Sequence, residues 1–200
     1  MEENLILIFT RNPEFGKVKT RLAASIGNQN ALDVYKFLLK HTQEIVSKVD
    51  ATRRVLYSEE IINNDIWDNK LYQKALQSGT DLGEKMKNAF AEGFKNGYKK
   101  IVIIGTDLYD LEASNIEIAF QKLENHDVVI GPAEDGGYYL LGLKCIPENI
   151  FSNKEWSTET VFKDTLNDIV TYKIHLLDTK NDIDIVDDIK NIQAFQKYLK

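Results

Sequence analysis

The sequence predicts an α/β protein built on a mostly parallel β-sheet with helices on both faces. Two observations support this. Apolar, β-rich runs alternate along the chain with segments of helical periodicity, and the first run, Leu5–Phe9, holds five consecutive apolar residues. Strands buried on both faces of a parallel sheet have this continuous apolar character. Strands that alternate with helices are typical of a parallel sheet with helical crossovers.

The elements follow in order along the chain. We expect strands at residues 4–10, 53–58, 100–106, 127–131, 138–144 and 172–177. The spacing of apolar residues predicts helices over 32–49, 86–97, 116–123, 161–169 and 185–199. The turn-rich stretch 131–137 predicts one antiparallel strand pair near an edge of the sheet. The chain has no internal repeat or linker, so residues 1–200 are predicted to form a single domain.

Composition excludes several classes of protein. The net charge of -6 argues against general nucleic-acid binding, which needs a basic face. Cys145 is the only cysteine, so an internal disulfide and a cysteine metal cluster are both excluded, and we expect a buried, inert thiol. The chain shows neither a secretory signal nor a membrane span, which predicts a cytoplasmic protein.

A basic loop follows the first strand. It carries the cations Arg11, Lys17, Lys19 and Arg21. A cationic loop between a central strand and the start of a helix is suited to a phosphate or diphosphate. Solvated loop residues would give the same pattern, so charge alone leaves both interpretations open.

Two familiar phosphate-binding motifs are absent from this loop. A Walker A loop requires Ser or Thr after Gly-Lys, but Val18 follows Gly16-Lys17, and Arg11 occupies the position of the upstream glycine. No G-x-G-x-x-G sequence follows the first strand, which argues against a dinucleotide-binding domain. The loop therefore depends on charge and a single glycine.

Carboxylates follow a second predicted strand and precede the last helix. Asp107 ends the run Ile101–Thr106, where it could hold Mg²⁺ or Mn²⁺ against a diphosphate or simply cap a turn before the next helix. The segment Asp178–Asp188 holds five aspartates against one lysine. There Asp184 is a good helix N-cap, with a second metal ligand as the alternative.

Two further loops carry weaker signals. Asp81 is a plausible cap for the helix that follows it. The stretch Glu134–Tyr138 contains an Asp-Gly pair, which is a strong turn signal, so this segment could be only a hairpin turn.

Six motifs occur in one order along the chain. They are P-x-x-G-x-x-K-T-R-L at Pro13–Leu22, D-L-G-E-K-M within Thr80–Met86, G-T-D at Gly105–Leu111, G-P-x-x-D-G-G-Y-Y-L at Gly131–Leu140, W-x-T-E-T-V at Trp156–Val161, and D-x-D at Asp182–Ile189. This combination resembles an uncharacterised bacterial group of GT-A-type transferases, labelled as radical-SAM-associated, selenodomain-associated or arsenosugar-biosynthesis glycosyltransferases. More broadly, it is similar to the nucleotidyltransferases that activate molybdopterin, sialic acid and phospholactate. The resemblance covers essentially the whole chain and implies a three-layer, Rossmann-like fold of the nucleotide-diphospho-sugar transferase (GT-A) type.

The resemblance also implies roles for individual residues. Lys19 and Asp107 would be catalytic, and Asp107 with Asp184 would hold Mg²⁺ or Mn²⁺. The residues expected to bind substrate are Arg11, Gly16, Lys19 and Arg21 at the phosphates, Asp81, Leu82 and Gly83 near the base or ribose, and Asp135, Gly136, Gly137 and Tyr138 at the acceptor. Two departures from the family pattern stand out: Tyr109 replaces a proline, and Ile185-Val186 replaces Thr-Pro.

Three activities are compatible with these motifs. The first hypothesis is transfer of a sugar from a nucleotide-diphospho-sugar, with release of the nucleoside diphosphate. The second is nucleotidyl transfer, which joins a nucleoside triphosphate to a phosphorylated acceptor and releases pyrophosphate. The third is a nucleotide-binding protein without turnover, for which nucleotide affinity would be indifferent to Mg²⁺ or Mn²⁺. The motifs carry no signal for the base, the acceptor or the number of subunits.

Overall fold

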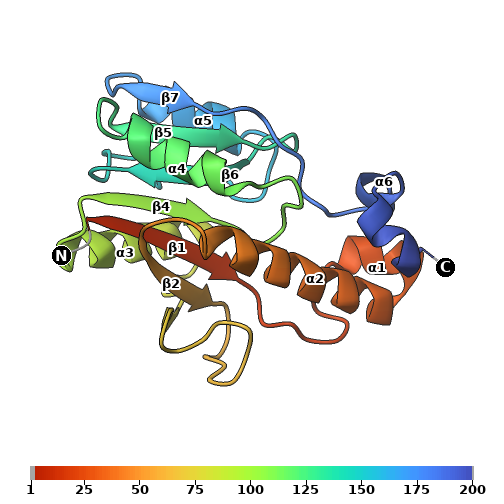
Figure 1. Cartoon of the computed structure of the whole chain (residues 1–200). Coiled ribbons are helices and arrows are strands. Elements are labelled where there is room, and N and C mark those ends of the chain that lie inside the picture. Colours follow the sequence, from red (N-terminus) through yellow and green to blue (C-terminus); the bar gives the residue numbers. More distant parts are fainter. Residues whose placement is uncertain (1–2, 200) are drawn as a thin grey trace.

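This computed structural model describes residues 3–199. The centre of the fold is a seven-stranded β-sheet (Figure 1). The strands are β1 (Asn4–Thr10), β2 (Thr52–Tyr57), β3 (Gln73–Leu76), β4 (Lys100–Ile104), β5 (Val128–Pro132), β6 (Tyr138–Leu143) and β7 (Ile174–Leu176). The helices are α1 (Thr20–Ile26), α2 (Asn28–Val46), α3 (Leu82–Lys95), α4 (Ala113–Lys122), α5 (Val161–Asp168) and α6 (Val186–Ile189), followed by a 3₁₀ helix, η1 (Gln193–Tyr198). The α/β fold class predicted from the sequence is confirmed.

The strands lie in the order β3-β2-β1-β4-β6-β5-β7. All neighbours are parallel except β6, which runs antiparallel to both β4 and β5. The predicted hairpin of β5 and β6 is therefore present. It lies near an edge of the sheet, as expected, because β5 is followed by the edge strand β7.

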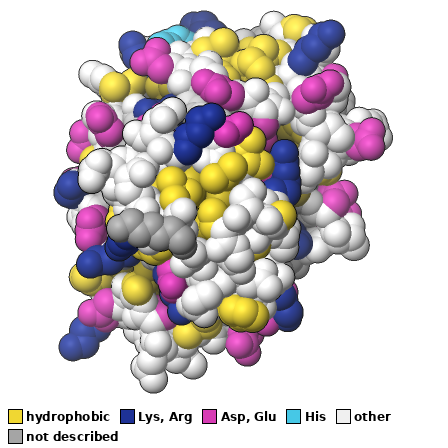
Figure 2. Space-filling model, turned by 90° about the vertical axis from the view of Figure 1, so that its right-hand side faces the viewer, with side chains coloured by type: hydrophobic (Ala, Val, Ile, Leu, Met, Phe, Trp, Pro, Cys, Tyr) yellow, Lys and Arg dark blue, Asp and Glu magenta, His cyan; other side chains and the backbone are white. Residues whose placement is uncertain are grey.

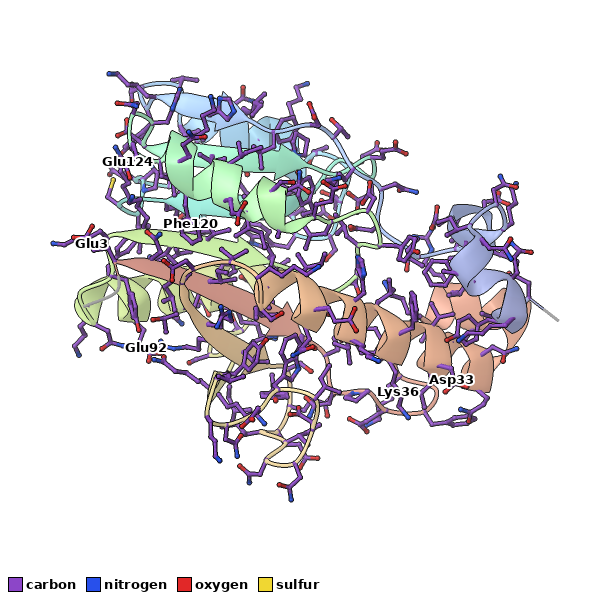
Figure 3. The ribbon with its side chains drawn as sticks, viewed as in Figure 1. Glu3, Asp33, Lys36, Glu92, Phe120 and Glu124 are labelled. Atoms are coloured by element: carbon purple, nitrogen blue, oxygen red, sulfur yellow. The ribbon has the colours of Figure 1, made fainter. Side chains whose placement is uncertain are left out.

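The two faces of the sheet are both apolar, which explains the continuous apolar run of β1. Ile6 and Ile8 pack on one side with residues of α2 and α4, whereas Leu5 and Leu7 pack on the other side against α3. All four side chains have no exposed surface. Figure 3 shows Phe120 pointing from α4 toward the sheet. Successive side chains of a strand point to opposite faces, so a central strand needs apolar residues at every position.

A third apolar cluster lies beyond the carboxyl ends of the strands. It joins Leu22 of α1 and Leu38 of α2 to Ile183, Ile189 and Phe195. Figure 1 shows α6 beside α1, away from the sheet. On this side of the molecule, hydrophobic side chains form a central patch surrounded by acidic and basic ones (Figure 2). The cluster fixes the C-terminal segment against the first two helices.

Several local expectations were wrong or incomplete. Strand β3 was not predicted, because Gln73–Leu76 is a short, partly exposed edge strand with little apolar character. The single helix expected over 185–199 divides into α6 and η1, because Ile192 takes an extended conformation and packs against the third cluster.

Asp184 is not the N-cap of the last helix. Ile185 holds that position, and the Asp188 carboxylate accepts hydrogen bonds from the backbone N–H groups of Asp184 and Ile185. Cys145 is exposed rather than buried. Within residues 3–199, no helix combines the length and apolarity required to cross a membrane.

Candidate functional site

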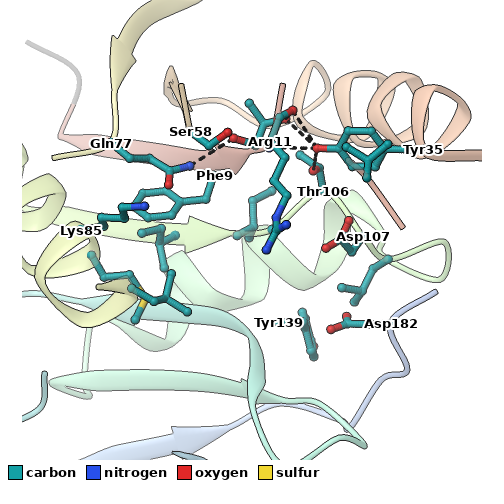
Figure 4. A pocket seen from close by; sticks show the side chains of 18 of the residues that line it. Phe9, Arg11, Tyr35, Ser58, Gln77, Lys85, Thr106, Asp107, Tyr139 and Asp182 are labelled. Atoms are coloured by element: carbon teal, nitrogen blue, oxygen red, sulfur yellow. Dashed lines mark hydrogen bonds between the residues drawn. The ribbon is translucent and has the colours of Figure 1, made fainter. Parts of the chain in front are cut away.

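A cavity of about 550 Å³ opens at the carboxyl ends of β1 and β4 (Figure 4). Its wall is formed by the loop after β1, the loop after β4, the first turn of α3, the start of β6 and the segment that precedes α6. In open α/β sheets, ligands bind outside the carboxyl ends of the strands. The volume is in the range of small-molecule sites.

The basic loop after β1 is anchored from beneath by Tyr35 of α2. The Tyr35 hydroxyl accepts a hydrogen bond from the Arg11 backbone N–H at 2.9 Å and lies 3.0 Å from the Arg11 carbonyl oxygen. It also lies within hydrogen-bonding distance of two threonine hydroxyls: that of Thr10, the last residue of β1, and that of Thr106, which lies just after the neighbouring strand β4. Burial, with the charge of Asp107 as a second cause, raises the pKa of Tyr35, so the hydroxyl stays protonated. The Arg11 side chain, which has no ion-pair partner among the described residues, projects into the middle of the cavity (Figure 4).

Lys19 is held in an unusual backbone conformation. Its φ of 48° and ψ of 46° place it in the left-handed region at the N-cap of α1, a conformation that costs a non-glycine residue about 1–2 kcal/mol. The conformation directs the side chain, only 8% exposed, to Asp107, where Nζ lies 3.0 Å from Oδ1. This approach lacks the direction of a hydrogen bond, and the buried Oδ1 atom accepts none among the described residues. The sequence-predicted residues Lys19 and Asp107 are thus brought together.

Asp182 is the second carboxylate of the cavity. The segment that carries it crosses the loop after β4, with the Ile183 N–H donating to the Asp107 carbonyl oxygen at 3.0 Å. Its Oδ1 atom is buried and has no hydrogen-bond partner among the described residues. Burial, and then the negative charges of Asp107 and Asp135, raise the pKa of Asp182 to about 7. Two carboxylates therefore face the same end of the cavity (Figure 4).

Asp184, two residues further on, has different contacts. Its Oδ2 atom accepts a hydrogen bond from Arg21 Nη1 at 2.6 Å, and both side chains are well exposed. Neither residue lines the cavity. The two predicted residues therefore form an ion pair with each other outside the lining of the cavity.

The start of α3 contributes one wall. Asp81 caps the helix, as the sequence indicated, by accepting a hydrogen bond from the Glu84 N–H at 2.8 Å. Leu82, one turn from Lys85 and Met86, lines the cavity with them. Gly83 lies under Trp156, and a Cβ atom there would be 2.4 Å from the indole ring. Gly83 therefore admits the Trp156 ring rather than contacting the cavity itself.

The hairpin of β5 and β6 contributes Tyr138 to the cavity wall, and its turn is stabilised by contacts of its own. Tyr138 lines the cavity, whereas the Asp135 carboxylate accepts a hydrogen bond from the Gly137 N–H at 2.8 Å within the turn. Gly136 has a φ of 87° and passes so close to the backbone of Glu159 that a Cβ atom would be 2.1 Å from its carbonyl oxygen. The turn is thus docked on the segment before α5. Gly16 also has a positive φ, 73°, in the basic loop.

The cavity residues that sequence reasoning missed include Tyr35, Gln77, Lys85 and Asp182. Tyr35 was assigned to the apolar face of a helix, with no sign that its hydroxyl supports a loop. Lys85 lies in the D-L-G-E-K-M motif, three residues after Leu82. This spacing puts both residues on one face of the helix and could have indicated that Lys85 lines the same site. Asp182 stands in the D-x-D pattern that was noted, but the pattern does not say which aspartate faces the cavity.

Comparisons with known proteins agree with this architecture. The chain is 27% identical over 142 residues to a 2-phospho-L-lactate guanylyltransferase of Methanobrevibacter ruminantium, covering 66% of this chain and 60% of the relative. It is 28% identical over 130 residues to the enzyme of the same name from Methanocaldococcus jannaschii, covering 64% of this chain and 54% of the relative. The chain thus spans little more than half the length of these curated relatives.

Solved structures extend the similarity over the whole chain. A candidate nucleotide-diphospho-sugar transferase of Desulfovibrio desulfuricans G20 superposes with a TM-score of 0.86 and 29% identity, covering 100% of this chain and 93% of that one. A cytidylyltransferase of Leptospira borgpetersenii superposes with a TM-score of 0.60 at 15% identity, covering 94% and 84%, and shows the fold alone. The GT-A-like fold inferred from the motifs is confirmed.

The family assignment comes from residues 41–158. This range, more than half of the chain, matches the model of a family described as "Uncharacterized protein conserved in bacteria (DUF2064)", and it contains the cavity residues from Ser58 to Ser157. With the motifs, the fold and the match in agreement, the chain belongs to the DUF2064 family of bacterial proteins.

Proposed function

We propose that this protein is a metal-dependent transferase that uses a nucleotide as its donor, and that it joins a nucleoside triphosphate to an acceptor with release of pyrophosphate. The observation that supports this most strongly is the meeting, in one cavity, of the cations of the loop after β1 with two carboxylates at the end of β4 and before α6. The similarity to two guanylyltransferases supports nucleotidyl transfer in particular.

The cationic side is suited to a polyphosphate chain. Arg11 and Lys17 line the cavity, and Lys19 lies directly behind Asp107. The Arg11 guanidinium can donate two parallel hydrogen bonds to phosphate oxygens. Lys19 offers a compact charge that can move from Asp107 to a phosphate oxygen with little rearrangement. These cations suit a diphosphate or triphosphate better than a monophosphate, although Lys17 is paired with Glu14 and Lys19 with Asp107.

The acidic side has the donor set for Mg²⁺ or Mn²⁺. Both ions take oxygen ligands, and Mg²⁺ uses one or two protein carboxylates together with phosphate oxygens and water. The buried Oδ1 atoms of Asp107 and Asp182 fit this requirement, because neither accepts a hydrogen bond from a described residue, although Lys19 is ion-paired with Asp107. Among residues 3–199, no group of three or more His, Cys, Asp or Glu side chains is placed to hold a metal ion by itself.

We therefore propose that Asp107 and Asp182 hold the ion. The sequence-based choice of Asp107 with Asp184 remains a prediction, in which Arg21 would have to release the Asp184 carboxylate. A bound divalent cation would supply charge neutralisation at the phosphate oxygens. Asp182 would then be ionised at neutral pH, because a cation reverses the effect of the neighbouring carboxylates.

In the proposed reaction, an anionic oxygen of the acceptor attacks the α-phosphorus of the triphosphate. A new phosphorus–oxygen bond forms, the bond from the α-phosphorus to the bridging oxygen breaks, and its electron pair leaves with pyrophosphate. Arg11 and Lys19 would neutralise the charge that develops on the leaving group. Such chemistry depends on positioning and electrostatics and needs no nucleophilic serine or cysteine.

Glycosyl transfer is the second candidate. The observation in its favour is the similarity, over the whole chain, to the candidate nucleotide-diphospho-sugar transferase. In this reaction the acceptor attacks the anomeric carbon, the bond between that carbon and the diphosphate oxygen breaks, and a nucleoside diphosphate leaves. Tyr138, with the turn Asp135–Gly137 behind it, would then border the acceptor in either reaction.

Product analysis distinguishes these reactions. The protein would be incubated with Mg²⁺ and each nucleoside triphosphate, or each nucleotide-sugar, in the presence of phosphorylated 2-hydroxy acids or other phosphorylated acceptors. Pyrophosphate release that depends on the acceptor is the expected result. Release of a nucleoside diphosphate from a nucleotide-sugar would instead establish glycosyl transfer. Nucleotide binding that is equal with and without Mg²⁺ or Mn²⁺, and without turnover, would contradict both.

A further inference from the structure

The side-chain amide of Gln77 is locked by the sheet. Its Nε2 donates to the Thr10 carbonyl oxygen at 3.1 Å and to the Leu56 carbonyl oxygen at 3.0 Å, while its backbone N–H donates to the Tyr57 carbonyl oxygen at 2.9 Å. A reversed amide would place Oε1 against two carbonyl oxygens, which is repulsive. The amide therefore has one orientation.

This orientation leaves Oε1 as a fixed acceptor. Both Nε2 hydrogens are directed at β1 and β2, so Oε1 points away from these strand ends, and no described residue donates a hydrogen bond to it. Gln77 lines the cavity. A ligand with an N–H group at this position would meet an acceptor that needs no reorganisation.

Lys85 lies at the same end of the cavity, with Phe9, whereas Asp107 and Asp182 lie at the other end and Arg11 lies between (Figure 4). The Lys85 ammonium has no ion-pair partner within residues 3–199. Leu82 and Met86, on the same face of α3, also line the cavity. This end therefore combines apolar surfaces with one fixed acceptor and one free cationic donor, which suits a flat heterocycle with polar edges.

We propose that the end of the cavity formed by Gln77 and Lys85 binds the base of the donor nucleotide, and that it prefers a base with an N–H group beside a carbonyl, as in guanine and uracil. This inference rests on the proposed function, which places the phosphates at Arg11 and beyond. Gln77 Oε1 accepts from the ring N–H, and Lys85 donates to the neighbouring carbonyl oxygen. Adenine and cytosine have an unprotonated ring nitrogen in place of that N–H and an amino group in place of the carbonyl. Gln77 Oε1 would then face a lone pair and Lys85 would face a donor, so both contacts are lost.

The test measures affinities by calorimetry with Mg²⁺ present, for GTP, UTP, ITP, ATP and CTP. We expect GTP, UTP or both to bind about tenfold more tightly than ATP and CTP, the effect of about one hydrogen bond. ITP keeps the N–H and carbonyl of guanine but lacks its amino group. ITP affinity within about threefold of GTP supports recognition of the N–H and carbonyl pair, and GTP against UTP distinguishes the two sources of that pair.

Two variants and their matched controls locate the effect. Gln77→Met and Lys85→Met should each weaken the preferred nucleotide about tenfold and change ATP binding by less than about threefold. Gln121→Met and Lys87→Met, on exposed helix positions, should leave all affinities unchanged. A merely structural role would weaken all nucleotides equally, and thermal unfolding of each variant identifies a loss of folding.

The outcomes separate this inference from the function on which it rests. If nucleotides bind with Mg²⁺ but ATP or CTP binds as tightly as GTP and UTP, the base preference is wrong and the proposed function stands. Equal weakening of every nucleotide by Gln77→Met also overturns it. If no nucleotide binds, the proposed function fails and the base preference fails with it.

Discussion

The two charged segments that meet at the cavity are held in different ways. The basic loop, residues 11–19, is fixed from inside the molecule by the hydroxyl of Tyr35 and by the left-handed conformation of Lys19. The acidic segment, residues 178–188, is fixed by backbone hydrogen bonds to the loops after β4 and β5, by an exposed ion pair and by the third apolar cluster. Exposed ion pairs stabilise a structure by about 0–1 kcal/mol. The cationic wall is thus held by side-chain contacts from inside the molecule, while the acidic wall is held by backbone contacts at the sheet and by packing beyond it.

The largest expected effect tests whether the two walls act on one ligand. Asp107→Asn should remove the increase in nucleotide affinity caused by Mg²⁺, a loss of about 100-fold, because a neutral amide is a poor ligand for the cation. Titrations with and without Mg²⁺ measure the loss. Asp110→Asn, in the same loop with an exposed side chain, is the matched control. Retention of the Mg²⁺ effect in Asp107→Asn would exclude Asp107 from the metal site.

The next effect tests the packing that positions the acidic wall. Tyr109 contacts Phe37, His41 and Phe195, with ring centroids 5.0–5.8 Å apart. Tyr109→Ala should lower the free energy of unfolding by about 2 kcal/mol and increase hydrogen exchange in residues 186–199, because a half-buried ring is lost. Tyr109→Phe keeps the ring and should change stability by less than about 0.5 kcal/mol. Unchanged exchange in Tyr109→Ala would show that the third cluster does not hold the C-terminal segment.

A pH effect follows from Asp182. Its pKa is raised to about 7 in the folded protein, so without a metal ion its contribution to stability is present below pH 4 and is lost as the pH rises through 7. The charged groups around it are Asp107, Asp135, Asp184 and Lys19. Asp182→Asn should remove this pH dependence, because a neutral amide does not titrate. Urea unfolding at pH 4–8 measures it, and an unchanged pH profile would contradict the shifted pKa.

The smallest effect tests the cationic wall. Tyr35→Phe removes the hydroxyl beneath Arg11 and should lower the free energy of unfolding by about 1 kcal/mol, because the Arg11 N–H loses its partner. Nucleotide affinity should fall about tenfold through the displaced loop. Tyr98→Phe, whose hydroxyl accepts an exposed hydrogen bond from Gln73, is the control. If Tyr35→Phe lowers stability but leaves affinity unchanged, the loop does not depend on this anchor.

Much of the framework could be predicted because its signals are local. The apolar runs of β1 and β4 identify central strands, and the charges that follow them identify loops at the same edge of the sheet. Asp81 was recognisable as a cap from its own neighbourhood. Strand β3 had no such signal, since an edge strand with one exposed side can be polar. The hydroxyl network of Tyr35 joins residues 24 to 71 positions apart, and no local pattern reports it.

The α/β class, the basic loop at the end of a central strand and the acidic segment near the C-terminus all follow from local sequence patterns. In contrast, the pairing of Asp182 with Asp107 at the cavity, and of Asp184 with Arg21, arises from the folded arrangement of distant segments. The reason is that Asp182 and Asp184 lie in an irregular segment, where the direction of each side chain depends on the part of the protein against which the segment packs. Here the contact between Leu108 and Asp182 fixes that direction, and it exists only once the end of the chain is laid across the loop after β4.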